Sequence, residues 1–149
     1  MSSTLFSSFA LRGLTLPNRI VVSPMCQYMS VDGSANDWHL MHLGQFAMGA
    51  AGLLITEATH VSPVCRITSR CLGLYSDENE KAIKHVVDFC RKYGVVKLGI
   101  QLAHAGRKGS THTPFEGGKP LATGEGAWTT LAPSALPFGP GWHVPEALS

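Results

Sequence analysis

Several patterns that would assign a function class directly are missing from the 149 residues. No apolar run approaches the roughly 20 residues that a membrane span needs, and the longest lies around residues 50–55. Lysine and arginine form no stripe, and the formal net charge is only +2, which argues against nucleic-acid binding. Neither a Gly-x-Gly-x-x-Gly fingerprint nor a Walker loop occurs, so a Rossmann dinucleotide site is unsupported. We expect no membrane and no nucleic acid among the partners.

Redox and metal motifs are also missing. The four cysteines show no Cys-x-x-Cys spacing, and the first residues lack the basic and apolar regions of a secretory signal. We therefore expect a cytoplasmic protein with reduced thiols. His39 and His42 lie three residues apart on an expected helix, but no carboxylate has a matching spacing. Exposed or capping roles are favoured for them, and no metal site is expected.

The residues that are present describe a globular chain, with 44% hydrophobic and 15% charged side chains. Residues 6–19 read as a hairpin. The continuous apolar run over residues 20–22 is typical of a strand buried on both faces. Residues 53–56 read as a second buried strand, and residues 95–102 as a third apolar strand. This order predicts an α/β fold in which helices cover a parallel sheet.

Two helices are expected between these strands. The first begins at Asn36 or Asp37, and its apolar stripe contains Leu40, Leu43, Ala47 and Ala50. The second is capped by Ser76 and ended by Gly94, and its stripe contains Ile83, Val86, Val87 and Cys90.

The last third of the chain is different in composition. Glycine, proline and threonine dominate residues 104–144, a length that indicates a functional segment rather than an ordinary connection. Residues 145–149 resemble the approach to a helix, with Ser149 as its N-cap. Three parallel strands leave open edges, whereas a closed barrel needs eight. We expect the other strands to come from a second polypeptide, a cleaved remainder or a longer form of the chain.

Polar side chains follow all three expected strands, at the edge where parallel sheets bind ligands. Cys26, after the first strand, is either an apolar filler or a functional group. Gln101 lies inside the third strand, where a buried amide needs a partner with both donors and acceptors. Arg107 and Lys108 form either a solvated turn or an anion clamp.

Five runs of residues, taken in order, resemble the Old Yellow Enzyme family of flavin-dependent ene-reductases. The runs are Pro24-Met25-Cys26-Gln27-Tyr28, Glu57-Ala58, Arg66-Ile67-Thr68, Gln101-Leu102-Ala103-His104-Ala105-Gly106-Arg107-Lys108 and Ala132-Pro133-Ser134-Ala135. The resemblance spans about Leu5 to Ser149 and is to the branch with a cysteine beside the flavin, which includes bacterial xenobiotic reductases. It implies the N-terminal part of an eight-stranded (β/α)8 TIM barrel with an N-terminal hairpin, FMN as cofactor, and NADPH or NADH as hydride donor.

The resemblance also implies a site. The residues that would contact FMN are Ser23, Pro24, Met25, Cys26, Ala58 and Gln101. Gln101 would bond the pyrimidine edge of the ring. Cys26 would tune the flavin potential rather than act as a nucleophile, and the Tyr28 hydroxyl would orient the substrate carbonyl.

Family members pass hydride from a nicotinamide to flavin, and then to an alkene conjugated to a carbonyl or nitro group. Their carbonyl-binding pair, proton donor and phosphate site lie beyond the residues matched here. The resemblance therefore implies that residues 1–149 are one portion of an FMN-binding domain, active only with a complementary C-terminal half, in an oligomer of completed barrels.

Two alternatives remain at this point. One is an inactive fragment or a piece that binds a partner. The other is a phosphate-binding aldolase barrel, although Lys108 follows its strand instead of ending it, as a Schiff-base lysine would.

Overall fold

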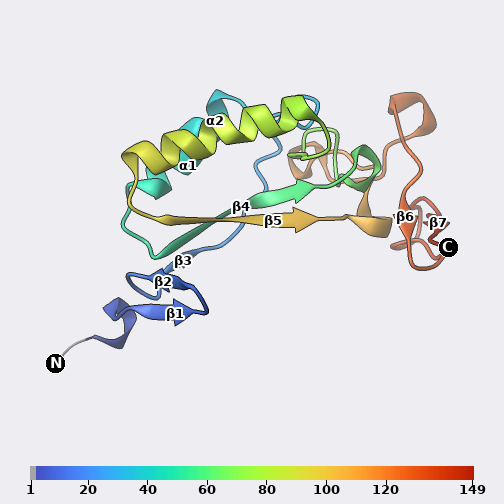
Figure 1. Ribbon diagram of the computed structural model, residues 1–149. Helices are drawn as coiled ribbons and strands as arrows, with labels where there is room; N and C mark the ends of the chain where they lie inside the picture. Colours follow the sequence, from blue (N-terminus) through green and yellow to red (C-terminus); the bar gives the residue numbers. More distant parts are fainter. Residues whose placement is uncertain (1–2) are drawn as a thin grey trace.

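The computed structural model describes residues 3–149. Its centre is a parallel sheet in the order β3-β4-β5, formed by Val21–Val22, Leu53–His60 and Lys97–Ala103. Helices α1 (Asp37–Ala47) and α2 (Asp77–Tyr93) connect these strands and lie together over one face (Figure 1). The predicted alternation of strands and helices around a parallel sheet is confirmed.

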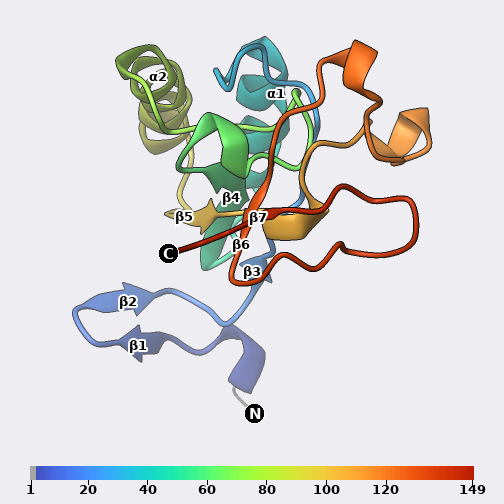
Figure 2. The ribbon, with the colours of Figure 1, turned by 90° about the vertical axis from the view of Figure 1, so that its right-hand side faces the viewer.

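The predicted hairpin is also present. Strands β1 (Phe9–Leu11) and β2 (Leu14–Leu16) pair antiparallel, and the turn between them places Arg12 at φ 52°. The hairpin lies at the end of the sheet where the parallel strands begin, away from the candidate site (Figures 1 and 2).

Both helices begin at the predicted caps. The Asn36 side chain accepts a hydrogen bond from the Trp38 N–H at 3.1 Å, and the Ser76 hydroxyl accepts one from the Asn79 N–H at 3.2 Å. The prediction that Ala50 belongs to the stripe of the first helix is wrong. Helix α1 ends at Ala47, and Ala50 has φ 59° in the turn that follows.

The core lies between the two helices and the covered face of the sheet. Its buried members are Leu43, Ala47, Ala51, Leu54, Val86, Cys90 and Val96. The helices approach closely at Gly44, where an added Cβ would lie 3.2 Å from Cε1 of Phe89. The two helices thus form one layer that covers this face of the sheet.

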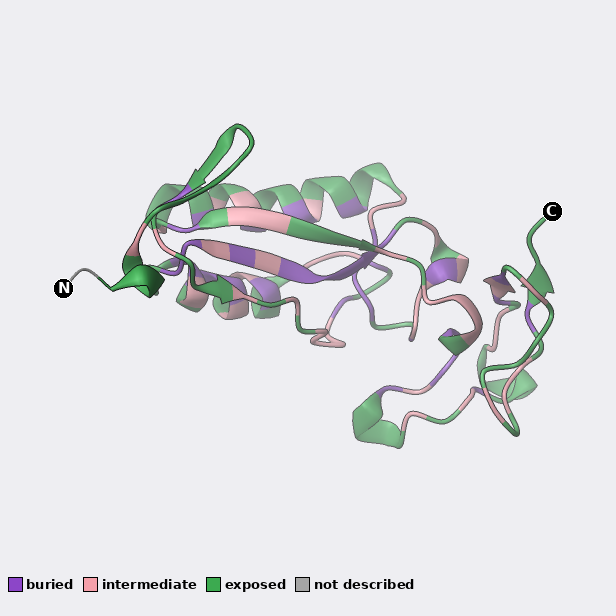
Figure 3. Cartoon of the chain, turned by 90° about the horizontal axis from the view of Figure 1, so that it is seen from below, coloured by how far each residue is buried: buried purple, intermediate pink, exposed green. Residues whose placement is uncertain are grey.

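The prediction that the first strand is buried on both faces is wrong, whereas the predicted burial of the second strand is confirmed. Strand β4 is buried along most of its length, but β3 and β5 are largely exposed (Figure 3). Ile100 and Leu102 of β5 are 43% and 60% exposed. The reason is that β5 is the edge strand and, within residues 3–149, no element pairs with its outer edge. Such an apolar edge is typical of a sheet that continues into further strands.

The segment after β5 contains short turns, as its composition predicted. Its 3-10 helices span Gly106–Lys108, Pro114–Glu116 and Thr123–Glu125. Two others, Thr4–Phe6 and Pro63–Cys65, lie earlier in the chain.

The segment that was predicted to approach a helix, residues 145–149, contains the short strand β7 (Glu146–Ala147), which pairs in parallel with β6 (Leu131–Ala132). The role of Ser149 as an N-cap stays a prediction. The Glu146 N–H donates to the Thr130 carbonyl at 2.9 Å. In the part of the chain that is described, no helix has the length and apolarity needed to cross a bilayer.

Candidate functional site

The carboxyl ends of the three parallel strands meet at one edge of the sheet, beside β6 and β7 (Figure 1). The pairing of β4 with β5 shifts there: Thr56 is opposite Ile100, but Ala58 is opposite Gln101. This irregularity is a bulge at Glu57. It places Ala58 beside Gln101 and directs the Glu57 carboxylate to α1. Strand β4 continues beyond the bulge to His60, two residues past the end predicted at Glu57-Ala58.

The segment after β3 passes over this edge and carries the predicted residues Ser23 to Tyr28. Ser23 and Met25 are exposed, whereas Pro24, Cys26 and Tyr28 are half-buried. Tyr28 has φ 56°, a left-handed conformation that costs a residue with a Cβ about 1–3 kcal/mol and persists only when its surroundings hold it. The neighbouring Gln27 N–H donates to Oε2 of Glu57 at 3.1 Å, which ties this segment to β4.

Cys26 lies in surroundings that favour the neutral thiol. Burial is the largest cause that raises its pKa, and the Cys71 thiol and the Glu57 charge raise it further. The Ala58 backbone N–H and the Tyr28 hydroxyl act in the opposite direction, and their effect is smaller. A neutral thiol is a poor nucleophile, which agrees with the tuning role implied by the resemblance.

The Tyr28 hydroxyl also stays protonated. Burial, followed by the neighbouring Cys26 and Cys71, raises the pKa of Tyr28 to about 12. Its ring meets Phe115 edge to face, with centroids 6.3 Å apart. Phe115 is 84% exposed on the long segment after β5. Tyr28 can therefore donate a hydrogen bond at any ordinary pH, beside an aromatic wall that the sequence did not predict.

Gln101 is less buried than the sequence predicted. Its side chain is exposed, so the argument from a buried amide does not hold for this chain. The physical reason is the open face of the sheet at the edge strand. Beside it, Ala58 and Ala103 have small side chains. A free amide next to small side chains fits a flat ring whose edge offers both donors and acceptors.

The two basic residues after β5 have separate surroundings. Arg107 is half-buried and donates to the Ser134 hydroxyl at 3.0 Å, which links two of the motif runs. Lys108 is exposed. Arg107 therefore acts as a cross-link between segments in this structure rather than as a solvated turn.

His39 takes the capping role that the sequence favoured, whereas His42 is neither exposed nor a cap residue and packs on a neighbouring ring. His39 is 1% exposed and bonds the cap residue Asn36, while the His42 ring packs on Phe46 with centroids 5.2 Å apart. No group of three potential metal ligands occurs among residues 3–149. All four cysteines are free.

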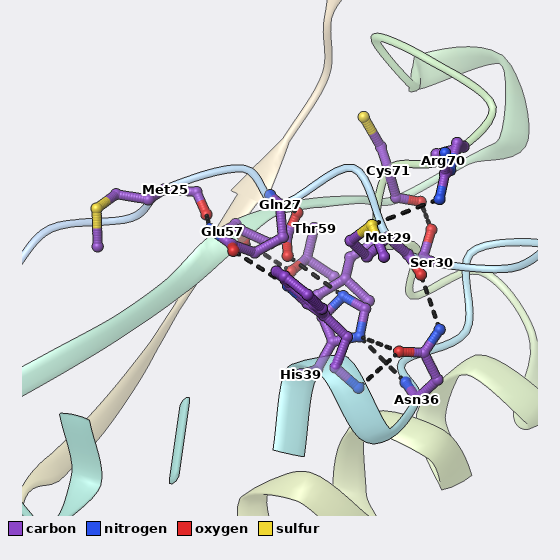
Figure 4. A network of polar contacts seen from close by, with 12 residues as sticks. Met25, Gln27, Met29, Ser30, Asn36, His39, Glu57, Thr59, Arg70 and Cys71 are labelled. Atoms are coloured by element: carbon purple, nitrogen blue, oxygen red, sulfur yellow. Dashed lines mark hydrogen bonds and ion pairs between the residues drawn. The ribbon is translucent and has the colours of Figure 1, made fainter. Parts of the chain in front are cut away.

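Sequence reasoning missed the contacts of Glu57. It treated this residue as one polar group at a strand end, yet the carboxylate is 4% exposed and contacts both Gln27 and His39 (Figure 4). A charged residue within an apolar strand run was the available signal, because a buried charge needs partners.

Comparisons with known proteins agree on one family. Residues 4–129 match the model of the NADH:flavin oxidoreductase / NADH oxidase family. An NADPH dehydrogenase of Bacillus cytotoxicus is 41% identical over all of this chain, which covers 39% of that protein. One from Listeria welshimeri is 52% identical over 71% of the chain and 32% of its own length.

Solved structures show the same relationship. Morphinone reductase in complex with tetrahydroNAD superposes with a TM-score of 0.75 at 28% identity, over 99% of this chain and 41% of the reductase. The Old Yellow Enzyme of a Pichia species gives 0.71 at 29% identity, over 89% of this chain and 32% of that enzyme. The chain thus spans about two fifths of the relatives that match it throughout. Its three parallel strands, two helices and hairpin are the N-terminal portion of their (β/α)8 barrel, and it belongs to the NADH:flavin oxidoreductase / NADH oxidase family.

Proposed function

We propose that residues 1–149 form part of a single FMN-binding barrel that uses NADPH or NADH to reduce C=C bonds conjugated to a carbonyl or nitro group. The observation that carries the proposal is the arrangement at the strand ends. Gln101 lies beside Ala58 on the open face, and the segment with Cys26 and Tyr28 passes over the same edge. The names of the relatives, NADPH dehydrogenase and morphinone reductase, support a nicotinamide donor and a reduced small molecule.

The residues that would hold FMN are Ser23, Pro24, Met25, Cys26, Ala58 and Gln101. When bound, FMN supplies the transfer of hydride from the nicotinamide to the alkene. The exposed Gln101 amide would pair with the polar edge of the ring. The small side chain of Ala58 would leave room for the ring on the open face.

Tyr28 would act on the substrate. Its hydroxyl stays protonated because its pKa is raised to about 12, so it would donate to the carbonyl or nitro oxygen and help hold the alkene in place. Phe115, in edge contact with the Tyr28 ring, would limit the movement of that ring.

The active unit would need further strands, because the chain spans only 39% of the Bacillus relative and its β5 edge is open. Such barrels would be expected to form oligomers. The second candidate is an inactive or partner-binding piece of the same barrel, favoured by the same open edge.

A fusion protein tests the proposal. Residues 1–149 are joined to the part of the Bacillus cytotoxicus NADPH dehydrogenase that lies beyond the match, and the product is called the completed barrel below. Supplied with FMN, it should oxidise NADPH when 2-cyclohexenone is added. If NADPH oxidation does not depend on the enone, the proposed activity is wrong.

Cys26→Ala should change the flavin potential of the completed barrel while FMN stays bound. Loss of a polarisable thiol beside the ring should shift the midpoint by about 30 mV, equivalent to ~1.4 kcal/mol for a two-electron couple. Spectroelectrochemical titration measures the shift. Cys90→Ala is the matched control, since Cys90 is buried on α2. Equal midpoints for wild type and Cys26→Ala would refute the tuning role.

Tyr28→Phe should slow the alkene half-reaction about tenfold, because one hydrogen bond of ~1.4 kcal/mol is lost. Reduction of FMN by NADPH should change less than about twofold by the same reasoning. Stopped-flow absorbance separates the two steps. Tyr93→Phe serves as control because Tyr93 is exposed on α2. Equal losses in both half-reactions would remove Tyr28 from the substrate site.

A further inference from the structure

We propose that the buried pair Glu57 and His39 is a positioning device that holds the Met25–Tyr28 segment in place over the edge of the sheet. The inference rests on the proposed function for its catalytic meaning, because that segment would carry the FMN contacts and Tyr28. Its physical basis is independent of any ligand. That basis is a continuous series of contacts, which runs from the cap of α1 through His39 and Glu57 to Gln27 (Figure 4).

Glu57 is the centre of this series of contacts. The bulge in β4 turns its carboxylate away from the open face, and only 4% of the residue is exposed. Oε2 accepts the Gln27 N–H at 3.1 Å, and Oε1 lies 3.3 Å from Nε2 of His39. A buried carboxylate is expensive without partners on its oxygens. The two contacts account for the position of both oxygens.

The cap of α1 orients His39. The Asn36 N–H lies 3.1 Å from Nδ1 of His39, which accepts its hydrogen bond. Nδ1 also lies 3.1 Å from Oδ1 of Asn36, but a ring nitrogen that accepts the Asn36 N–H carries no hydrogen to donate to that oxygen. Both the Asn36 N–H and the carboxylate therefore select the tautomer with hydrogen on Nε2. The Nε2–H faces Oε1 without the alignment of a hydrogen bond, so the contact is an attraction between the N–H dipole and the carboxylate charge.

Gln27 is held at both its backbone and its side chain, and this fixes the place of the residues on either side of it. Its backbone is held by Glu57, its Nε2 donates to the Met25 carbonyl at 2.8 Å, and its Oε1 accepts from the Trp38 ring N–H at 3.2 Å. Cys26 and Tyr28 flank it directly. The left-handed φ of Tyr28 needs such support, because an unsupported chain would leave that conformation.

The charge of Glu57 acts on the same segment. It is one of the causes that raise the pKa of the Cys26 thiol, after burial and Cys71, and it also raises the pKa of Tyr28. Removing that charge should leave more thiolate on Cys26 at a given pH. The same charge also raises the pKa of Cys71, but Cys71 is fully buried, so the accessible Cys26 is the cysteine whose reactivity can report the change.

Glu57→Gln is a sharp perturbation because it cannot satisfy both neighbours. Whichever way the new amide is turned, its NH2 group faces a donor, either the Gln27 N–H or Nε2–H of His39. The segment should loosen and the charge is lost. Glu80→Gln is the matched control, since it removes an exposed carboxylate from α2.

His39 offers a rescue test. His39→Leu removes both ring nitrogens, leaving Oε1 of Glu57 and the Asn36 N–H without their partners. His39→Gln restores an acceptor for Asn36 and a donor for Glu57 on one planar group. The glutamine variant should therefore behave like wild type. The leucine variant should loosen the segment as Glu57→Gln does, while the Glu57 charge stays in place.

The experiment is alkylation of the FMN-free completed barrel with iodoacetamide, read for each cysteine by peptide mass spectrometry across pH. Cys26 is half-buried, whereas Cys65, Cys71 and Cys90 are buried. At pH near 7.5, Glu57→Gln should speed Cys26 alkylation about three- to tenfold, because the pKa of the thiol falls and the segment loosens. His39→Leu keeps the Glu57 charge, so it should speed alkylation less, through loosening of the segment alone. Glu80→Gln and His39→Gln should stay near wild type, and the three buried cysteines should be unchanged.

Three results would overturn the inference. Cys26 could be alkylated at the same rate in Glu57→Gln and Glu80→Gln, or as fast in His39→Gln as in His39→Leu. All four cysteines could also react faster together, which would indicate general unfolding. A wild-type completed barrel that binds no FMN would overturn the proposed function instead, because the alkylation is measured without flavin.

Discussion

A completed barrel carrying Gln101→Leu should bind FMN about 10- to 100-fold more weakly than wild type. Gln101 lies opposite Ala58 where β4 and β5 end, and its amide is exposed on the face that the remaining strands would enclose. Once that face is closed, a ring edge left without its partner amide costs about 1–3 kcal/mol, which corresponds to this loss of affinity.

The measurement is a titration of FMN followed by quenching of flavin fluorescence. Gln45→Leu is the control, because it makes the same replacement at an exposed position of α1. Leucine is close to glutamine in size, so the fold of β5 should be kept. If Gln101→Leu binds FMN as tightly as Gln45→Leu, Gln101 does not contact the ring.

Residues 1–149 should show no enone reduction alone and should regain it when the rest of the barrel is supplied as a second polypeptide. Strand β5 is an open edge, and Ile100 and Leu102 on it are 43% and 60% exposed. Exposed apolar edges favour pairing with further strands. The groove beside α2, lined by Ile83, Val87 and Ile100, offers apolar surface to the next helix of a barrel.

The test is to co-express residues 1–149 with the C-terminal part of the Bacillus relative. Co-purification then measures whether the two polypeptides associate, and an NADPH oxidation assay measures enone reduction. Activity should rise from undetectable to a readily measured rate. As a control, Ile100→Asp places a charge on the surface to be buried and should block co-purification. A flavin-loaded, active chain 1–149 without any partner would contradict the expectation.

The order of elements was accessible from the sequence because local signals agree. Ser76, the acidic first turn and Gly94 mark α2 without reference to the rest of the fold, and Asn36 caps α1 as predicted. Burial was harder to predict. An apolar run does not tell whether the elements that cover it lie in the same chain, so β3 and Gln101 were expected to be buried and are largely exposed.

The candidate site was partly accessible for a similar reason. The resemblance named Cys26, Tyr28, Ala58 and Gln101, and the structure brings their segments to one edge. The Glu57–His39 contact was not foreseen, because it depends on a bulge that redirects one side chain and on a cap that orients one ring. Neither has a pattern that spacing alone reveals. The β6–β7 pair was missed because its hydrogen bonds join residues about 15 apart.

The central claim is that the strand ends of this chain form the flavin side of an FMN site once the barrel is complete. Its most direct measurement is the visible absorbance of the wild-type completed barrel after FMN is added and unbound flavin is removed by gel filtration. The account predicts a yellow protein with about one FMN per barrel. A colourless, folded barrel would contradict it.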